Sequence, residues 1–161
     1  RDVYQHLLKR LQPKKSRTVV DATGQLLTNV LPYRPFLIKP NHHELGDIFG
    51  VRLKDREDIA RYAHKLQEQG ARNVLVSMAG DGALLLDEVG NLHYSPAPQG
   101  KVINAVGAGD SMVAGFLYGY LTYGDYSEAF RWGLCAGSAT AFHSGLATRR
   151  DIEELIHSFT V

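Results

Sequence analysis

The sequence predicts an α/β protein, a three-layer α/β/α sandwich whose sheet is mostly parallel and carries an antiparallel hairpin at its side. Apolar strand-like runs alternate with amphipathic helical patterns, the order in which helical crossovers build a parallel sheet. The run at residues 73–77 is almost continuously apolar, which is typical of a strand covered on both faces. The turn at residues 88–91 joins two short runs, 83–87 and 92–95, into the hairpin.

The first half of the chain contains two further predicted strands separated by helical segments. Apolar residues at helical spacing predict a first helix that ends at Pro13, and residues 18–21 then form a buried strand. Residues 36–41 form the next strand, which Pro40 halts. The following helix begins at Asn41.

Capping residues mark the other helices. Asp55 precedes a helix that Gly70 closes with the glycine signal of helix C-termini. In the second half, Asp110 or Ser111 stands where the N-cap of an apolar-periodic helix is expected, and Thr148 caps the last helix.

Size and composition indicate an ordinary globular domain. The 161 residues are enough to bury a real core, and 44% hydrophobic with 22% charged residues is not the composition of a disordered chain. A net charge of +1 gives no argument for nucleic acid or an anionic membrane as a partner. No apolar run approaches the about 18 residues of a membrane span, and the start has no apolar signal-peptide core. The single cysteine, Cys135, is expected to be a buried thiol, so a cytoplasmic location is expected.

The most informative stretch is Val-Ile-Asn-Ala-Val-Gly-Ala-Gly-Asp-Ser-Met-Val-Ala-Gly at residues 102–115. Its glycines let the backbone approach a ligand closely, and the helix that follows directs the positive end of its dipole at the same space. This combination favours an anion-binding site. Asp110 beside it is either a helix cap or a base, and the glycines are equally compatible with a turn that only starts a packed helix.

A second informative string is Lys-Pro-Asn-His-His-Glu at residues 39–44. Asn41 and Glu44 have the spacing of a capping box at the start of a helix. His42 and His43 are adjacent and diverge on a helix, so we expect surface residues rather than metal ligands.

These strings resemble the signatures of the PfkB (ribokinase-like) carbohydrate kinases, in which Gly-Ala-Gly-Asp opens a helix. The resemblance implies that the amides of Gly107, Ala108 and Gly109 hold the charge of the transferred phosphoryl group. It also implies that Asp110 is the base that accepts the proton of the sugar hydroxyl. Many members have Asp-Thr before the glycines, whereas residues 104–105 here are Asn-Ala. That form resembles the branch that phosphorylates fructose 1-phosphate or tagatose 6-phosphate.

The same resemblance implies a site for ATP and Mg²⁺. Glu44 would organise water around Mg²⁺ while Asn41 helps to position the metal and the phosphates, and Lys39 would face a phosphate of the nucleotide. Further nucleotide contacts are implied for the backbone or side chains of Ser77, Ala79, Gly80, Gly82, Gly107 and Gly109.

We expect these residues to meet at one edge of the sheet. Residues 39–44, 77–82 and 105–110 each follow a predicted strand, and ligands of such sheets bind outside the carboxyl ends of the strands. A helix at 127–143 is rich in alanine and glycine, which predicts close packing against the helix that contains residues 115–119 or, alternatively, a wall for the adenine ring.

Members of the family are about twice as long as this chain and carry these motifs in their carboxyl-terminal half. Residues 1–161 are therefore expected to be the nucleotide-binding and catalytic portion of a partial domain, inactive alone and homodimeric when complete. The expected reaction is ATP-dependent phosphorylation of fructose 1-phosphate to fructose 1,6-bisphosphate. Tagatose 6-phosphate or another sugar is the alternative acceptor, and a non-catalytic nucleotide-binding module is the alternative of a different class.

Overall fold

The computed structural model describes residues 3–11, 14 and 16–159. Two compact units make up the chain: Arg1–Met78 with Leu84–Leu92, and Ala79–Ala83 with His93–Val161. Pro13, which the sequence predicts to end the first helix, lies outside the described residues.

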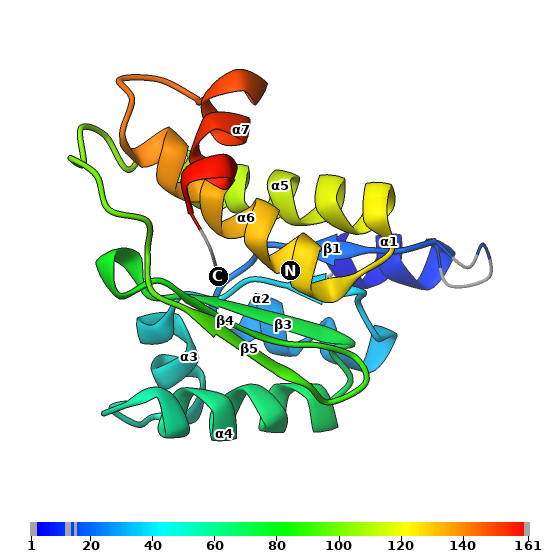
Figure 1. The fold of residues 1–161 in the computed structure, drawn as a ribbon. Coiled ribbons are helices and arrows are strands. Elements are labelled where there is room, and N and C mark those ends of the chain that lie inside the picture. Colours follow the sequence, from blue (N-terminus) through cyan, green and yellow to red (C-terminus); the bar gives the residue numbers. More distant parts are fainter. Residues whose placement is uncertain (1–2, 12–13, 15, 160–161) are drawn as a thin grey trace. The chain divides into compact units, whose positions relative to one another are not determined.

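A sheet of five strands in the order β1-β2-β3-β4-β5 runs through the described part of the chain (Figure 1). The strands are β1 (Val19–Val20), β2 (Leu37–Ile38), β3 (Asn73–Ser77), β4 (Ala83–Leu86) and β5 (Leu92–Ser95). β1 pairs in parallel with β2, and Val20 lies opposite Ile38. β2 pairs in parallel with β3, and Ile38 lies opposite Val74. The predicted α/β class and the parallel part of the sheet are confirmed.

The last two strands form the predicted hairpin. β4 follows β3 after residues 78–82, and β5 follows β4 after residues 87–91, and such short connections cannot make a parallel crossover. Each strand is therefore antiparallel to the one before it. The buried carboxylate of Asp87 closes the turn by accepting hydrogen bonds from the backbone N–H groups of Val89 at 3.0 Å and Asn91 at 2.8 Å.

Helices of the first unit pack an apolar face on its strands. They are α1 (Val3–Leu11), α2 (Gly24–Thr28), the 3₁₀ turn η2 (Leu31–Tyr33), α3 (His42–Phe49) and α4 (Arg56–Glu68). Ile59, Ala63 and Leu66 recur at helical spacing on α4, and all three are buried in one core with Val74 and Val76 of β3. Figure 1 shows α3 and α4 on one face of β3.

The second unit is built on two helices in close contact. α5 (Ala108–Tyr123) and α6 (Tyr126–Ala141) lie side by side, and α7 (Arg149–Ser158) packs on α6 (Figure 1). A Cβ atom added to Gly115 would lie 2.5 Å from the carbonyl oxygen of Trp132 and 2.6 Å from the Cβ of Ala136. Gly119 leaves room in the same way for Ala129. The close packing predicted for this glycine-rich pair is confirmed.

Thr148 caps α7 as predicted, through a capping box with Asp151. The Thr148 backbone N–H donates to Asp151 Oδ2 at 2.8 Å, and the Thr148 hydroxyl donates to the same oxygen at 2.7 Å. These hydrogen bonds, that of the hydroxyl first, lower the pKa of the Asp151 carboxyl.

Two predictions for the segment before α5 are wrong. Residues 105–110 are expected to follow a strand, but the short apolar run before them, residues 102–103, forms none, and the side chains of Val102 and Ile103 are 63% and 60% exposed. Two apolar residues suggest a strand, but they lack the paired neighbour that a strand needs. Residues 105–110 therefore do not follow a strand. The N-cap of α5 is neither Asp110 nor Ser111 but Gly107, whose left-handed φ of 80° turns the chain into the helix without a side-chain cap.

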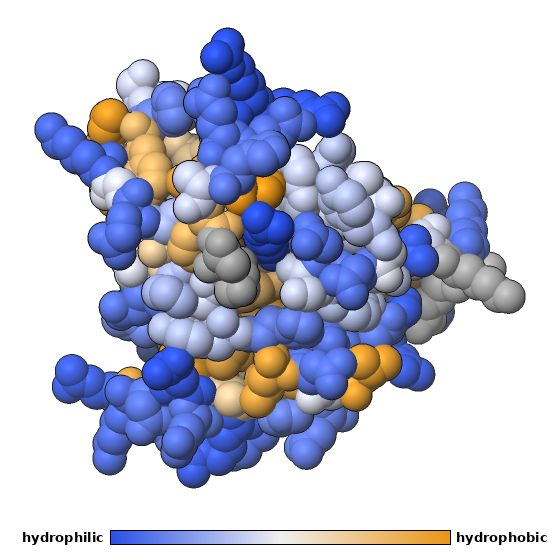
Figure 2. All heavy atoms as spheres, in the orientation of Figure 1, coloured by the Kyte–Doolittle hydropathy of each residue, from blue (hydrophilic) through white to orange (hydrophobic). Residues whose placement is uncertain are grey.

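Hydrophilic side chains cover most of the face seen in Figure 2, and apolar groups interrupt them in separate patches. The more exposed large apolar side chains include Val89 (74%), Val106 (78%) and Leu146 (69%). Within the described ranges, no helix combines the length and the apolar character needed to cross a membrane.

Candidate active site

In the first unit, charged residues lie at the carboxyl ends of the parallel strands. Asp21 follows β1, and Lys39 follows β2. The Lys39 ammonium lies 3.7 Å from Asp21 Oδ2, although only 8% of Lys39 is exposed. A buried ammonium needs such a partner because desolvation disfavours an isolated charge. The parallel register of β1 and β2 brings these two residues together.

Asn41 and Glu44 form the capping box of α3 that the sequence suggests. Asn41 Oδ1 accepts a hydrogen bond from the Glu44 backbone N–H at 2.9 Å. Glu44 Oε2 accepts one from the Asn41 backbone N–H at 2.8 Å. The reciprocal pair satisfies two backbone donors and holds both half-buried side chains in fixed positions. Glu44 Oε1 is not part of the cap.

Ser77 lies next to Asn41 across the sheet. An isolated parallel bridge pairs Asn41 with Ser77, and the Ser77 backbone N–H donates to Pro40 O at 3.2 Å. The structure thus places Asn41 and Ser77 side by side and Lys39 at the end of the same strand. Three of the predicted nucleotide-contacting residues share one edge of the sheet in this unit.

Replacing Asn41 separates the capping role from any role toward a ligand. Asn41→Ala is expected to lower the free energy of unfolding by about 1 kcal/mol, because the first turn of α3 loses its side-chain acceptor. Asn41→Asp is expected to keep the stability of the parent, since aspartate is an equally good N-cap. Urea unfolding measures both values. Equal unfolding midpoints for the alanine variant and the parent would contradict a stabilising cap.

In the second unit, the glycine turn at residues 79–82 is tightly packed at Gly82 and accessible to solvent at Ala79 and Gly80. Ala79 begins the 3₁₀ turn η3 (Ala79–Asp81) with a left-handed φ of 51°. Gly82 has φ of 97°, and a Cβ there would lie 2.0 Å from Ser95 O, so glycine is required. Gly80 is exposed, and a Cβ on it would meet nothing within 4 Å. The open backbone of Ala79 and Gly80 is therefore the part that a ligand can approach.

Asn104 shapes the loop that leads into α5. Its Oδ1 accepts a hydrogen bond from the Val106 backbone N–H at 3.0 Å, and its Nδ2 donates to Ser144 O at 3.2 Å. The first contact is the local turn that asparagine forms with the backbone two residues later. In the sequence, Asn104 stands out only as a departure from a motif, although an asparagine before a glycine-rich turn is a signal for this geometry.

The first turn of α5 supplies free backbone donors beside an exposed carboxylate. The Ala108 N–H donates to Ala105 O at 3.2 Å, and the first helical hydrogen bond runs from the Ser111 N–H to Gly107 O at 2.9 Å. Gly109 and Asp110 lie between them, at positions where a helix offers no preceding carbonyl. The Asp110 side chain is exposed rather than turned into the protein. An anion at this turn would meet the N–H groups of Gly109 and Asp110 and the positive end of α5.

A hydrogen bond between two side-chain hydroxyl groups connects this turn to α6. The buried Thr140 hydroxyl donates to Ser111 Oγ at 2.8 Å and accepts from the Ala147 backbone N–H at 3.1 Å. Thr140 therefore positions the residue that follows Asp110. This role of Thr140 is not predictable from the sequence, because a threonine within an alanine-rich helix gives no sign of a contact this distant in the chain.

Within the part of the chain that the structure describes, the cysteine and the adjacent histidines do not form a second catalytic or metal-binding site. Burial raises the pKa of the Cys135 thiol to about 12, while the charge of Arg131 acts in the opposite direction, so the thiol stays neutral. His43 is exposed and His42 is half-buried. Among the described residues, no group of three or more His, Cys, Asp or Glu side chains is placed to hold a metal ion.

Comparison with known proteins identifies the class. Residues 1–153 match the pfkB family carbohydrate kinases, and the chain belongs to this family. It is 44% identical over 155 residues to the 1-phosphofructokinase of Bacillus subtilis, an alignment that covers 96% of this chain and 51% of the relative. It is 37% identical over 146 residues to the D-tagatose-1-phosphate kinase of Bacillus licheniformis, covering 90% of this chain and 48% of the relative.

A solved structure agrees with these relatives. The structure of a Staphylococcus aureus protein named as a phosphofructokinase superposes with a TM-score of 0.92 at 38% identity, over 97% of this chain and 51% of that one. The chain thus spans about half the length of the relatives that it matches.

Proposed function

We propose that the chain is the nucleotide-binding and catalytic portion of an ATP-dependent kinase that phosphorylates fructose 1-phosphate to fructose 1,6-bisphosphate. The observation that carries the proposal is the exposed Asp110 in the first turn of α5, beside backbone donors without helical partners. The 44% identity to the Bacillus subtilis 1-phosphofructokinase supports the acceptor. The 37% identity to a D-tagatose-1-phosphate kinase makes a tagatose phosphate the second candidate.

Asp110 is the proposed base. An exposed carboxylate can accept the proton of the acceptor hydroxyl as that oxygen attacks the γ-phosphorus of ATP. Negative charge then spreads over the oxygens of the transferred phosphoryl group. The N–H groups of Gly109 and Asp110 are fixed donors for that charge, and Gly107 allows close approach. Of the three amides that the family resemblance implies, those of Gly107, Ala108 and Gly109, the amide of Ala108 is proposed to contribute least, because it already donates a hydrogen bond within its turn.

Lys39 is proposed to balance the charge of a nucleotide phosphate. Its ammonium lies at the end of β2, where the contact with Asp21 orients it without a bidentate contact. Ser77 on the neighbouring strand, with Ala79, Gly80 and Gly82 in the turn that follows, is proposed to contact ATP. Of these, Ala79 and Gly80 offer the most accessible groups, because Ser77 is half-buried and Gly82 is buried against the backbone of Ser95.

The residues present fit an indirectly held Mg²⁺. Mg²⁺ keeps several of its waters and is bound mainly through substrate phosphates, so a cage of three or more acidic side chains is not needed. Glu44 uses Oε2 for the cap and keeps Oε1 to accept hydrogen bonds from such waters, and Asn41 is fixed beside it. When bound, Mg²⁺ neutralises charge on the nucleotide phosphates.

Titration with Mg-ATP and a turnover assay test the proposal. We expect the chain alone to bind Mg-ATP weakly and to release negligible ADP, because it spans half the length of its relatives. A chimaera in which this chain replaces the aligned segment of the Bacillus subtilis relative is expected to bind Mg-ATP and to turn over fructose 1-phosphate. Calorimetry and a coupled ADP-release assay with fructose and tagatose phosphates measure both properties.

The outcomes separate the alternatives. If the folded chimaera does not bind Mg-ATP, the kinase proposal is wrong. If it binds Mg-ATP but turns over no sugar phosphate, the result favours a non-catalytic nucleotide-binding module. Full activity of the chain alone would contradict the interpretation that it is a partial domain.

Asn41→Asp keeps the cap but places a second negative charge beside the proposed metal–phosphate cluster. It should therefore weaken Mg-ATP binding in the chimaera about tenfold without loss of stability.

A further inference from the structure

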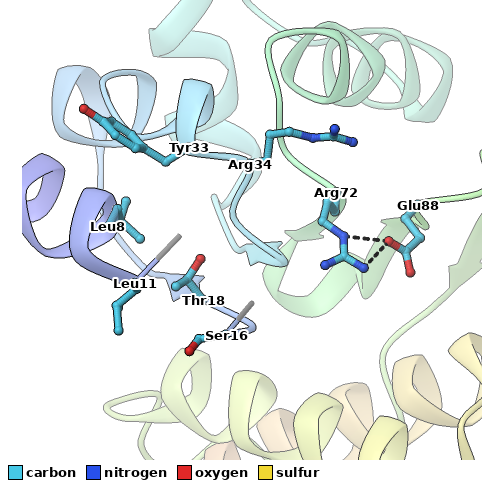
Figure 3. Close-up of a pocket in the computed structure, with 8 residues that line it drawn as sticks. All are labelled: Leu8, Leu11, Ser16, Thr18, Tyr33, Arg34, Arg72 and Glu88. Atoms are coloured by element: carbon cyan, nitrogen blue, oxygen red, sulfur yellow. Dashed lines mark hydrogen bonds and ion pairs between the residues drawn. The ribbon is translucent and has the colours of Figure 1, made fainter. Parts of the chain in front are cut away.

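The amino-terminal end of the sheet in the first unit carries a cleft of about 520 Å³. Figure 3 shows Leu8 and Leu11 of α1 on one side of the cleft and Arg34 and Arg72 on the other. Thr18 also lines it. The volume is within the range of small-molecule sites, and the lining is mainly polar, with cationic groups and a smaller apolar part.

Within the first unit, the cleft and the part of the candidate site formed by Asp21, Lys39 and Ser77 lie at opposite ends of the same strands. Thr18 directly precedes β1, and Arg72 directly precedes β3, whereas Asp21, Lys39 and Ser77 lie at the other ends. Five residues of β3 span about 16 Å at the rise of a strand, so a small ligand in the cleft would not touch Lys39 or Ser77.

Arg72 is held in place before any ligand arrives. Its Nε donates to Glu88 Oε2 at 2.7 Å, and its Nη2 lies 2.6 Å from the same oxygen. The guanidinium also lies over the ring of the buried Phe36, 5.2 Å from its centroid. Gln67 Nε2 donates to the Arg72 carbonyl at 3.1 Å. The side-chain entropy that binding normally costs is therefore already lost in this residue.

Arg34 brings an exposed positive charge to the same cleft. Its backbone is left-handed, with φ of 53° and ψ of 58°, a conformation that favours glycine. Among the described residues, no carboxylate lies within ion-pair distance of its guanidinium. The glutamate in the cleft, Glu88, is engaged by Arg72, so the cleft keeps a net positive charge.

We infer that this cleft binds a small organic phosphomonoester, at the end of the sheet opposite to Lys39 and Ser77. Guanidinium groups match the geometry of phosphate oxygens, and Arg34 and Arg72 supply two of them from adjacent loops. The hydroxyl of Thr18 adds a donor. The half-buried Leu11, with the small exposed edge of Leu8, is the apolar part of the lining that can contact the organic group of the ligand, which inorganic phosphate lacks.

Nuclear magnetic resonance titration of the isotope-labelled chain tests this inference with three probes: phenyl phosphate, inorganic phosphate and phenol. Phenyl phosphate is expected to bind most tightly, because it alone engages both walls. It should shift the backbone amide signals of Thr18, Arg34 and Arg72. Arg34→Gln is expected to raise its dissociation constant about tenfold, since one charge-assisted contact is lost. The control, Arg52→Gln, removes an exposed arginine outside the cleft and should stay within about twofold.

A second variant covers the case in which Arg34→Gln fails to fold. Arg34→Lys keeps the charge but not the planar fork, and it should bind phenyl phosphate more weakly than both the parent and the Arg52→Gln control. Equal dissociation constants for the Arg34 and Arg52 variants would overturn the inference. So would shifts confined to residues 39–44 and 107–110, which would assign the phosphate to the proposed active site instead.

Discussion

Asp110→Asn is expected to lower kcat of the chimaera by roughly two to four orders of magnitude, with Mg-ATP affinity within about twofold of the parent. The amide has nearly the same shape as the carboxylate but cannot accept the hydroxyl proton. The side chain is exposed in the first turn of α5, so the loss falls on the chemical step rather than on folding. Coupled ADP release gives kcat, and calorimetry gives the affinity.

The control for this variant is Asp47→Asn, which removes an equally exposed carboxylate from α3. It is expected to keep kcat within about twofold, because Asp47 has no proposed role. A loss of stability is also expected to be small for Asp110→Asn, at most about 1 kcal/mol, since a charge near the start of a helix contributes about that much. Retention of more than a tenth of the parent kcat would rule out Asp110 as the base.

Gly115→Leu is expected to lower the free energy of unfolding by about 3 kcal/mol. Helix propensity alone predicts the opposite sign, because leucine is favoured over glycine within a helix by nearly 1 kcal/mol. The loss comes from contact with α6. Even a Cβ at this position would lie 2.5 Å from Trp132 O and 2.6 Å from Ala136 Cβ, and one of the two partners is backbone that cannot turn aside.

The matched control is Ala114→Leu, one position earlier on the exposed side of the same helix. It adds the same side chain without the contact, and we expect a change within about 0.5 kcal/mol. Urea unfolding of both variants measures the difference. If the Gly115 variant is as stable as the parent, the two helices do not pack as closely as described.

Local patterns in the sequence predict most elements of this fold, because each depends on residues close together in the chain. The apolar run of β3, the hairpin turn and the caps at Asp55 and Thr148 are confirmed. The expected strand at residues 102–103 and the N-cap at Asp110 or Ser111 are wrong. In the first case two apolar residues cannot reveal whether a partner strand is present, and in the second the conformation of Gly107 outweighs a side-chain cap.

The candidate site is predictable in part for the same reason. Asn41 and Glu44 form a local pair, and their spacing reveals it. The ion pair of Asp21 with Lys39 depends on the register of two parallel strands, which no local pattern contains. The hydrogen bond between Thr140 and Ser111 likewise joins residues that only tertiary packing brings together. The roles of Asp110 and of the nucleotide-contacting residues stay predictions.

The backbone contact between α5 and α6 has a mechanical consequence for the proposed base. Helices separated by large side chains can shift relative to one another as those side chains change rotamer. Helices that contact each other through glycine have no such side chains between them and are less free to shift. The hydroxyl of Thr140 adds a tether at Ser111, next to Asp110. The orientation of the Asp110 carboxylate therefore depends on both helices. A change in that orientation through a movement of α5 requires α6 to move with it.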